Sequence, residues 1–466
     1  HSELYGFTVS WELDFVEVLR QLERFSIPWL SCERMQDERL VFAGGPVLTA
    51  NPEPFADFFD VILLGDAEVT VPRFLQEYRQ LSGKSRQEKL RALAAVPGVY
   101  VPSLYQCTYE SACGPLLNVT PIDSSLPERV MKEIYRPPDD YVAHSVLLSR
   151  EASWGDVFLL EVVRSCPQEC RFCLASFLTR PFRSASVETV ISKVDLALPH
   201  TKKIGLMGPS ITEHPEFTSI VERLQERDLQ VSIASVRADT LDKTLVEGLV
   251  SLGQKSVTIA IESGSERLRG IMKKNLSNQE IENAVDAAQS GGLEAIKFYG
   301  MVGLPWEIEE DLNETVTLLT RLKKQHRKLR FTFGVSSFVP KAQTPFQLKG
   351  RDRASGSKIE HLRKPLARLG IEVRPESHNW SDIQGLLSRG DRRLTPVLTE
   401  IACSAGRLGD WRKALKQNRD QVPSLDYYAF RDIPQDECLP WAHITPEDKG
   451  TYLNRHLNEA SALSQT

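Results

Sequence analysis

Strand-like and helical patterns alternate six times in the central part of this chain. Apolar runs predict strands at residues 157–163, 203–207, 230–234, 256–261, 295–301 and 330–338. Apolar residues at helical spacing predict helices at residues 187–198, 215–226, 242–252, 278–291, 307–325 and 358–369. Strands joined in series by helices form a parallel sheet, so this repeat predicts a partial (β/α)6 TIM-type barrel over residues 156–370. The strands are mostly continuous apolar runs, which indicates that both faces of the sheet are covered.

The chain on either side of the repeat has different patterns. Residues 1–98 carry about three strand signals alternating with helix signals, and two of these strands end in Gly44-Gly45-Pro46 and Gly65-Asp66. This pattern is typical of a doubly wound α/β domain, here with an incomplete sheet. Residues 99–155 are predicted to be a linker, and residues 371–466 a small, mostly α-helical C-terminal region.

Composition narrows the classes of function. The 466 residues include 57 Lys and Arg against 62 Asp and Glu, a net charge of -5 that leaves no clear footprint for nucleic acid or an anionic membrane. No apolar run approaches the roughly 20 residues of a membrane-spanning helix, and no secretory signal is evident. Eight cysteines with one tight group do not make a disulfide framework in a chain this long, so we expect a reducing, cytoplasmic compartment. Because the chain begins with His1, we expect a fragment or a processed chain.

The tight group of cysteines follows the first predicted strand of the repeat. Cys166, Cys170 and Cys173 have the spacing C-x3-C-x2-C. Three thiolates at this spacing favour an iron–sulfur cluster, because they can hold three irons of a [4Fe–4S] cubane and leave the fourth open. A structural zinc site is the main alternative, but it normally needs four ligands and no second cysteine pair lies nearby. Three inert core cysteines fit poorly with the charged Glu169 and Arg171 between them.

The position of the cysteines matches that of an active site. They lie at the end of a barrel strand where the βα loops converge, and active sites of βα barrels gather on that face. The cysteine motif, Phe172 just before the third cysteine and the barrel length together resemble the radical S-adenosylmethionine (SAM) enzymes over about residues 157–345.

The resemblance implies a cofactor set and a chemistry. Cys166, Cys170 and Cys173 would hold the cluster, whose open iron chelates the amino and carboxylate groups of SAM. One electron, from a donor of the flavodoxin or ferredoxin type, would split the S–C5′ bond and yield a 5′-deoxyadenosyl radical. Phe172 would lie against the adenine, with plain packing as its alternative.

Loops after the next three strands resemble SAM-contacting elements of the same enzymes. The turn at Gly208 corresponds to one that receives the SAM amino group; its usual acid is missing, although Glu213 is close. Ser235 and Arg237 resemble a Ser-x-Arg element for ribose or carboxylate, with a surface salt bridge as the alternative for Arg237. Glu262 and Ser263 begin a Glu-Ser-Gly-Ser-Glu turn in which Glu262 would accept ribose hydroxyls, and helix capping is the alternative for the serines.

The flanking regions resemble those of the branch associated with cobalamin-binding domains, in particular an uncharacterised subgroup with a divergent N-terminal domain. Residues 1–98 resemble the cobalamin-binding-like domain, but the Asp-x-His-x-x-Gly motif that supplies the cobalt ligand is missing from the 466 residues. Either the motif lies upstream of His1 or the domain is a relic that binds no cobalamin, and we favour the relic, so the resemblance allows cobalamin without favouring it. Residues 389–393 and 439–444 resemble the tail of that subgroup, and Asp391 and His443 either reach the site or serve packing and capping.

Two functions are consistent with these features. The first is a radical SAM enzyme acting on an unknown small-molecule or macromolecular substrate, by methyl transfer or by hydrogen abstraction. Without the cobalt-ligand motif, cobalamin-dependent methyl transfer is the less favoured of these. The second is a non-catalytic scaffold stapled by an iron–sulfur cluster or by zinc.

Overall fold

The computed structural model describes residues 3–34, 39–136 and 141–465. The chain divides into two compact units, each made of segments far apart in the sequence. The N-terminal unit comprises residues 1–135, 339–351 and 379–458, and the barrel unit comprises residues 136–338, 352–378 and 459–466. The division into four consecutive domains stays a prediction.

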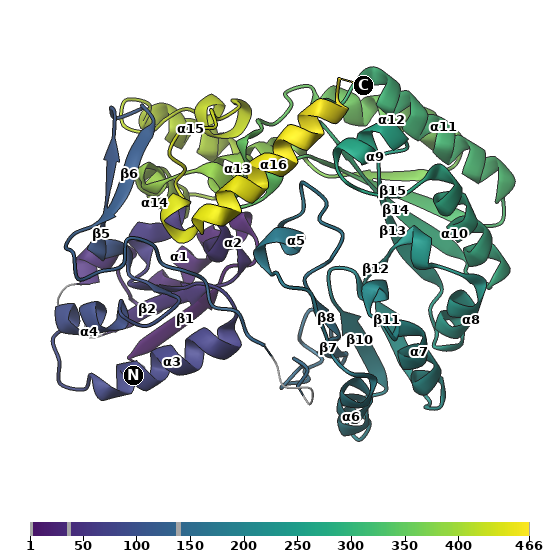
Figure 1. The fold of residues 1–466 in the computed structure, drawn as a ribbon, viewed down its shortest axis with the longest axis horizontal. Helices are drawn as coiled ribbons and strands as arrows, with labels where there is room; N and C mark the ends of the chain where they lie inside the picture. Colours follow the sequence, from purple (N-terminus) through teal and green to yellow (C-terminus); the bar gives the residue numbers. More distant parts are fainter. Residues whose placement is uncertain (1–2, 35–38, 137–140, 466) are drawn as a thin grey trace. The chain divides into compact units, whose positions relative to one another are not determined.

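The barrel unit contains the predicted parallel strands in sequence order (Figure 1). One sheet has the order β11-β10-β7 and the next has the order β12-β13-β14-β15-β16, with every pair parallel. The two end strands β7 and β16 do not pair with each other, so the barrel is open, as predicted. The strands are β7 (Phe158–Glu161), β10 (Lys203–Met207), β11 (Gln230–Ile233), β12 (Ser235–Val236), β13 (Ser256–Glu262), β14 (Ala295–Val302), β15 (Arg330–Ser337) and β16 (Glu372–Pro375).

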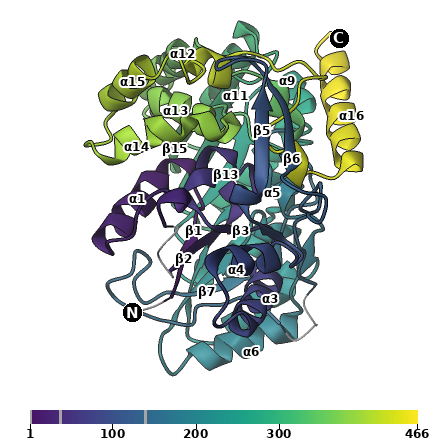
Figure 2. The same cartoon turned by 90° about the vertical axis from the view of Figure 1, so that its left-hand side faces the viewer.

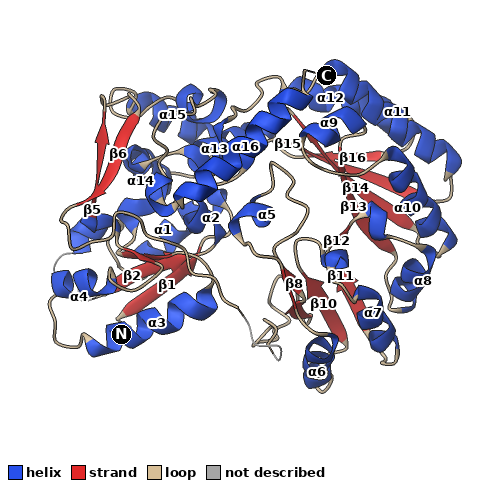
Figure 3. Ribbon diagram, in the orientation of Figure 1, coloured by secondary structure: helices blue, strands red, loops and turns tan. Residues whose placement is uncertain are grey.

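Helices cover one face of these strands (Figures 1 and 3). Ser186, Asp242 and Ser277 each accept a backbone N–H at the start of a helix, which explains where three of the helices begin. The helices are α6 (Val187–Ala197), α7 (Phe217–Gln225), α8 (Lys243–Ser251), α10 (Asn278–Ser290), α11 (Glu309–Gln325) and α12 (Ser355–Arg368).

The strands differ on their two faces, contrary to the expectation that both faces are covered. On β14, Ile296 and Phe298 are buried in the main apolar core that the helices share. Tyr299, on the opposite face, is 40% exposed, and Lys297 beside it donates to the Tyr299 hydroxyl at 2.6 Å. The apolar composition of the strands therefore reflects the helix-covered face, and the other face carries polar groups.

The N-terminal unit contains a small sheet with the order β1-β2-β3-β4. Its first three strands are parallel, and β4 lies antiparallel to β3. A separate hairpin of β5 and β6 comes from the stretch predicted to be a linker (Figure 2). The strands are β1 (Leu4–Thr8), β2 (Leu40–Gly44), β3 (Val61–Leu63), β4 (Val99–Tyr100), β5 (Tyr105–Tyr109) and β6 (Leu116–Pro121).

The C-terminal region is mostly helical, as predicted. Its helices are α13 (His378–Arg389), α14 (Thr395–Ala402), α15 (Leu408–Gln417) and α16 (Glu447–Leu463). Among the residues that the structure describes, every helix is too short or too polar to cross a bilayer.

A buried polar cluster joins distant segments of the N-terminal unit. Glu53, which is fully buried, accepts from Arg392 at 2.7 Å and from the Tyr100 hydroxyl at 2.6 Å. Arg392 also donates to the Tyr100 hydroxyl at 2.5 Å, and the Cys107 thiol lies 3.5 Å from Glu53. Burial opposes ionisation of Glu53, but the Arg392 cation outweighs it and lowers the pKa of the carboxyl. We call these residues, with His443, the Glu53 cluster.

Asp391 and His443, which were predicted either to reach the active site or to serve packing and capping, both have partners inside the N-terminal unit. His443 lies 3.4 Å from Glu53, and burial lowers its pKa to about 4, so the ring is neutral at pH 7 and the contact is not an ion pair. Asp391 accepts from Arg393 at 2.7 Å and from the Tyr428 hydroxyl at 2.9 Å. These contacts fit the packing and capping role of both side chains.

The pKa of His443 predicts a dependence of stability on pH. The unfolded state takes up a proton near pH 6.5, whereas the folded state does so only near pH 4, so the free energy of unfolding falls as the pH falls between these values. Between pH 6.5 and pH 5 we expect the N-terminal unit to lose about 2 kcal/mol. Most of the loss from Glu53 comes below its ordinary pKa of 4.5, and Asp57, whose pKa burial raises, opposes the histidine because it stabilises the fold as the pH falls. Denaturant titrations at several pH values test the slope, and an equal slope in His443→Gln would contradict the assignment.

Candidate metal centre

The three cysteines lie on a tightly wound loop at the carboxyl end of the first barrel strand. This loop runs from β8 (Val163–Arg164) to α5 (Leu174–Leu178), and Cys173 occupies the position just before α5. Ser165 and Glu169 have φ values of 71° and 55°, a left-handed conformation that costs a residue with a side chain on the order of 1 kcal/mol. Glycine would avoid this cost at Ser165.

The thiols lie close enough to influence one another. Burial raises the pKa of Cys170 to about 12; Lys274 opposes this rise, while the charges of Cys173, Glu262 and Cys166 contribute to it. Burial also raises the pKa of Cys166, and Cys173 again adds to the effect. Without a counter-charge these groups stay protonated at neutral pH, so their grouping suits a metal that supplies positive charge to thiolates.

Two buried donors beside the cysteines have no hydrogen-bond acceptor in the part of the chain that the structure describes. They are the Ser176 hydroxyl and Nε of Arg171, on side chains that are 1% and 3% exposed. Ser176 is close enough to Cys166 to lower the pKa of its thiol. Cluster sulfurs and thiolates accept such hydrogen bonds, so the orphaned donors fit an iron–sulfur cluster.

A site for a single metal ion fits less well. Over residues 3–34, 39–136 and 141–465, no three His, Cys, Asp or Glu side chains are grouped so that they could hold one metal ion. Structural zinc sites bring four ligands onto one ion, whereas a cubane spreads its cysteines over several irons.

The segment that follows α9 (Glu266–Ile271) holds the cysteine loop in place. The backbone N–H of Arg171 donates to Met272 O at 2.8 Å, and its guanidinium donates to Ile271 O at 2.8 Å and to Glu459 at 2.9 Å. Glu169 accepts from Lys273 at 2.6 Å. The loop conformation thus depends on backbone carbonyls and the Lys273 side chain about 100 residues further along the chain, and on Glu459.

Charged side chains from the next two strand ends meet near the cysteines. Arg237 forms ion pairs with Glu213 at 3.1 Å and with Asp239 at 2.6 Å, and it is 7% exposed. Gln168, inside the cysteine motif, donates to Glu213 at 2.7 Å. The alternative of a surface salt bridge for Arg237 therefore does not describe this buried pair.

A second buried pair lies at the end of β13. Glu262 and Lys274 are 3.6 Å apart with side chains only 11% and 10% exposed, and burial raises the pKa of Glu262. Glu262 has a φ of 63°, at an irregularity in the β13–β14 pairing that follows Ala260. Both Glu262 and Lys274 act electrostatically on Cys170, which places this pair next to the cysteines.

The remaining predicted residues differ in how they are placed. Phe172 and Ser235 are half-buried, and a Cβ at Gly208 would lie 2.9 Å from Val163 O, so the turn needs glycine at this position. The Ser263 hydroxyl is buried, accepts from Ser265 N–H at 3.1 Å and lies 3.4 Å from Thr315. Ser265 accepts from Leu268 N–H at the start of α9, as the capping alternative proposed.

Several residues of the site carry no sequence signal of their own. Arg171, Ser176 and Lys274 join it through contacts with the cysteine loop or with Glu262. Only the consecutive lysines at 273–274, shortly after the predicted Ser265 cap, would have drawn attention to the second supporting segment.

An open βα barrel with three thiols on the loop after its first strand is the arrangement of barrel proteins that carry their reaction centre at the strand ends. Residues 160–319 match the family described as "Radical SAM superfamily", and residues 1–102 match "Radical SAM proteins, N-terminal". An uncharacterized protein of Methanocaldococcus jannaschii is 33% identical over 361 residues, which cover 76% of this chain and 72% of that protein. The chain belongs to the radical SAM superfamily, whose enzymes bind a [4Fe–4S] cluster and SAM and cleave SAM reductively.

More distant relatives include enzymes named for their activities. The threonylcarbamoyladenosine tRNA methylthiotransferase MtaB of Aquifex aeolicus is 22% identical over 255 residues, and the match spans 52% of this chain and 61% of that enzyme. Among solved structures, the cobalamin-dependent SAM radical enzyme OxsB, with aqua-cobalamin and SAM bound, is similar with a TM-score of 0.49 and 14% identity. That similarity covers 97% of this chain and 57% of OxsB.

Cobalamin fits the N-terminal unit poorly. Doubly wound sheets bind their ligands beyond the carboxyl ends of the strands. Beyond β3, a Cβ at Gly65 would collide with the backbone of Glu133. Beyond β2, Gln343 donates to Thr49 O at 2.8 Å and to Ala50 O at 3.0 Å. The chain itself covers these strand ends, so we derive no step through cobalamin.

Proposed function

We propose that this chain binds a [4Fe–4S] cluster through Cys166, Cys170 and Cys173 and uses it to generate a 5′-deoxyadenosyl radical that attacks a substrate. The observation that carries the proposal is the meeting of three mutually interacting thiols with two orphaned buried donors at one loop. When bound, the cluster supplies one electron and an open iron to SAM.

The buried ion pairs beside the cysteines suit the charged end of SAM. The carboxylate of SAM would find a bidentate partner in Arg237, which is now paired with Glu213 and Asp239. Glu213 and Glu262 offer carboxylates for the amino group and for ribose hydroxyls. Phe172, Gly208, Ser235 and Ser263 complete the proposed SAM contacts, Ser263 by holding the turn through its buried hydroxyl.

These pairs also argue against a scaffold without catalysis. A structural cluster needs no cations and carboxylates gathered at its open side, and buried ion pairs stabilise a fold poorly when compared with apolar residues. Arg237 with Glu213 and Lys274 with Glu262 are therefore better explained by a ligand with charges of both signs.

The redox setting follows from the cysteines. All eight cysteines are free thiols, in keeping with the proposed reducing, cytoplasmic compartment. The electron that reduces the cluster would come from a protein of the flavodoxin or ferredoxin type.

The test is anaerobic reconstitution with iron and sulfide, followed by reduction with dithionite in the presence of SAM. We expect 5′-deoxyadenosine to form, and the EPR spectrum of the reduced cluster to change when SAM is added. A cluster that is loaded and reduced but neither changes its spectrum nor cleaves SAM would overturn the proposal in favour of the scaffold.

Arg171 predicts a separate effect on cluster retention. Arg171→Met removes the guanidinium that ties the cysteine loop to Ile271 O and Glu459, so we expect iron to be released to a chelator about 10 to 100 times faster. Arg180→Met is the matched control: Arg180 is 45% exposed and pairs with Glu169 of the same loop, so we expect little change. Equal release rates in the two variants would contradict a positioning role for Arg171.

A further inference from the structure

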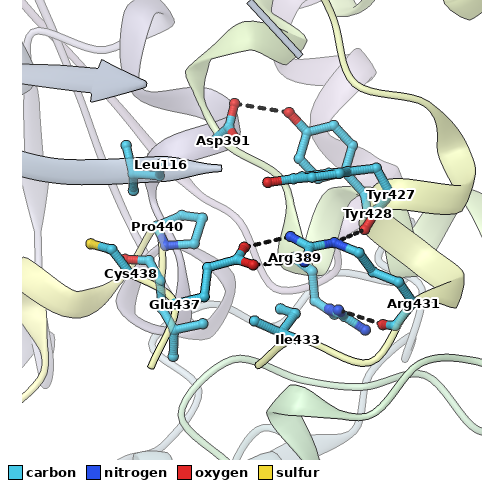
Figure 4. Close-up of a pocket in the computed structure, with 11 residues that line it drawn as sticks. Leu116, Arg389, Asp391, Tyr427, Tyr428, Arg431, Ile433, Glu437, Cys438 and Pro440 are labelled. Carbon is cyan, nitrogen blue, oxygen red and sulfur yellow. Dashed lines mark hydrogen bonds and ion pairs between the residues drawn. The ribbon is translucent and has the colours of Figure 1, made fainter. Parts of the chain in front are cut away.

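Two sequence segments without a role in the proposed radical chemistry line one cavity of the N-terminal unit (Figure 4). Arg389 and Asp391 come from residues 389–393, at and just after the end of α13; Pro440 comes from residues 439–444, and Glu437 lies just before them. The cavity measures about 10 Å³, which is room for one species of about the size of a water molecule.

Arg389 is a buried cation without an acidic partner. It is 2% exposed, and its guanidinium donates to Lys349 O at 2.7 Å and to Arg431 O at 2.9 Å. Its Nε has no hydrogen-bond partner, and among the described residues no carboxylate forms an ion pair with it, although Asp432 and Glu437 act on it from a greater distance. Buried guanidinium groups are normally paired, and the carbonyl end of α13 offsets only part of a full charge.

The acidic side chains around the cavity are already paired with other cations. Glu437 accepts from both guanidinium ends of Arg431, at 2.7 Å and 2.5 Å, as Figure 4 shows. Asp391 is bound by Arg393 and by the Tyr428 hydroxyl. The positive charge of Arg389 is therefore not neutralised by an ion pair with either carboxylate.

Arg431 adds a second positive charge beside Arg389. Arg431 stacks on the ring of Tyr427, 3.8 Å from the centroid, and its backbone carbonyl contacts the Arg389 guanidinium. Burial and then the charge of Arg431 lower the pKa of Arg389 to about 9, and the opposing charges of Asp432 and Glu437 do not cancel this effect. The protein thus holds a guanidinium under conditions that oppose its charge, next to a cavity of the size of one small ion.

We propose that this cavity binds one small monovalent anion of halide size, held by the Nε–H of Arg389. The surplus charge selects an anion over a neutral molecule, and the volume excludes phosphate esters, nucleotides and SAM. The site lies wholly within the N-terminal unit, so it is independent of the cluster and of the proposed function.

The direct test uses crystals of the full chain grown or soaked in sodium bromide. We expect an anomalous difference peak at hydrogen-bonding distance from Arg389 Nε, about 3.3 Å. Density for a water molecule without an anomalous peak would overturn the proposal.

Thermal unfolding of the full chain supplies a second test, in sodium bromide or chloride against sodium gluconate at equal ionic strength. We expect midpoints about 2 °C higher in the halides, and no such difference in Arg389→Met. Arg419→Met, which removes an exposed arginine of the same unit, should keep the halide effect. A halide effect that survives in Arg389→Met, or a larger effect from sulfate, would overturn the site. If Arg389→Met does not fold, the bromide map of the unaltered chain decides.

Discussion

Replacing Cys170 with serine is expected to abolish cluster binding and SAM cleavage together. Cys170 is the most buried of the three thiols. Its pKa depends on the charges of Cys166 and Cys173 and on those of Lys274 and Glu262. A serine hydroxyl at this depth is not ionised at neutral pH, so it cannot replace a thiolate. Loss of groups that merely support metal ligands costs about 10 to 100-fold, so the loss of a ligand should lower the yield of 5′-deoxyadenosine by more than about 100-fold.

Iron analysis and EPR spectroscopy after reconstitution measure the first part of this result, and product analysis measures the second. Cys403→Ser is the matched control, because Cys403 is an exposed thiol in the N-terminal unit and the chemical change is identical. We expect the control to bind iron and cleave SAM like the unaltered chain. A Cys170→Ser variant that keeps a SAM-responsive cluster would disprove the assignment of the ligands.

Breaking the Glu53–Arg392 pair is expected to destabilise the N-terminal unit by about 3 to 5 kcal/mol. Glu53→Gln removes the anion but leaves the Arg392 guanidinium buried against Tyr100 and the amide. The cost arises from this uncompensated charge, so it should shrink when Arg392→Met is added. The double variant should therefore be more stable than the sum of the two single losses predicts.

Local unfolding is best followed by hydrogen exchange of peptides that contain β4 and β5, because a chain with two units need not unfold in one step. Glu17→Gln provides the control, since Glu17 pairs with Arg20 on an exposed face of the same unit. We expect it to change stability by less than about 0.5 kcal/mol. Additive losses in the Glu53 and Arg392 variants would mean that the pair is not coupled.

Local periodicity explains what could be predicted of the fold. The sequence predicts the six βα units because the apolar pattern of each strand or helix can be recognised within about ten residues. β16 was missed, since Glu372–Pro375 is mostly exposed and has no apolar run. The interruption at Ala234 between β11 and β12 also has no composition signal, because it depends on how neighbouring strands curve.

Some residues of the candidate site can likewise be predicted from local sequence, and others cannot. Cys166, Cys170 and Cys173 could be named from their spacing, and Arg237 and Glu262 from the strand ends that they follow. Their partners could not be named, because Arg171 meets Glu459 across 288 residues. Nothing local marks two such residues as neighbours.

The sequence by itself determined the βα repeat, the cysteine motif at its first strand and, through them, the superfamily. Only the tertiary structure decided that residues 339–351 and 379–458 complete the N-terminal unit, and that Arg389 lies there without an acidic partner. The physical reason is the separation along the chain of the residues that interact. Periodicity and motif spacing record interactions within one element, whereas burial and charge pairing depend on segments that meet only after folding, as Glu53 and Arg392 do across 339 residues.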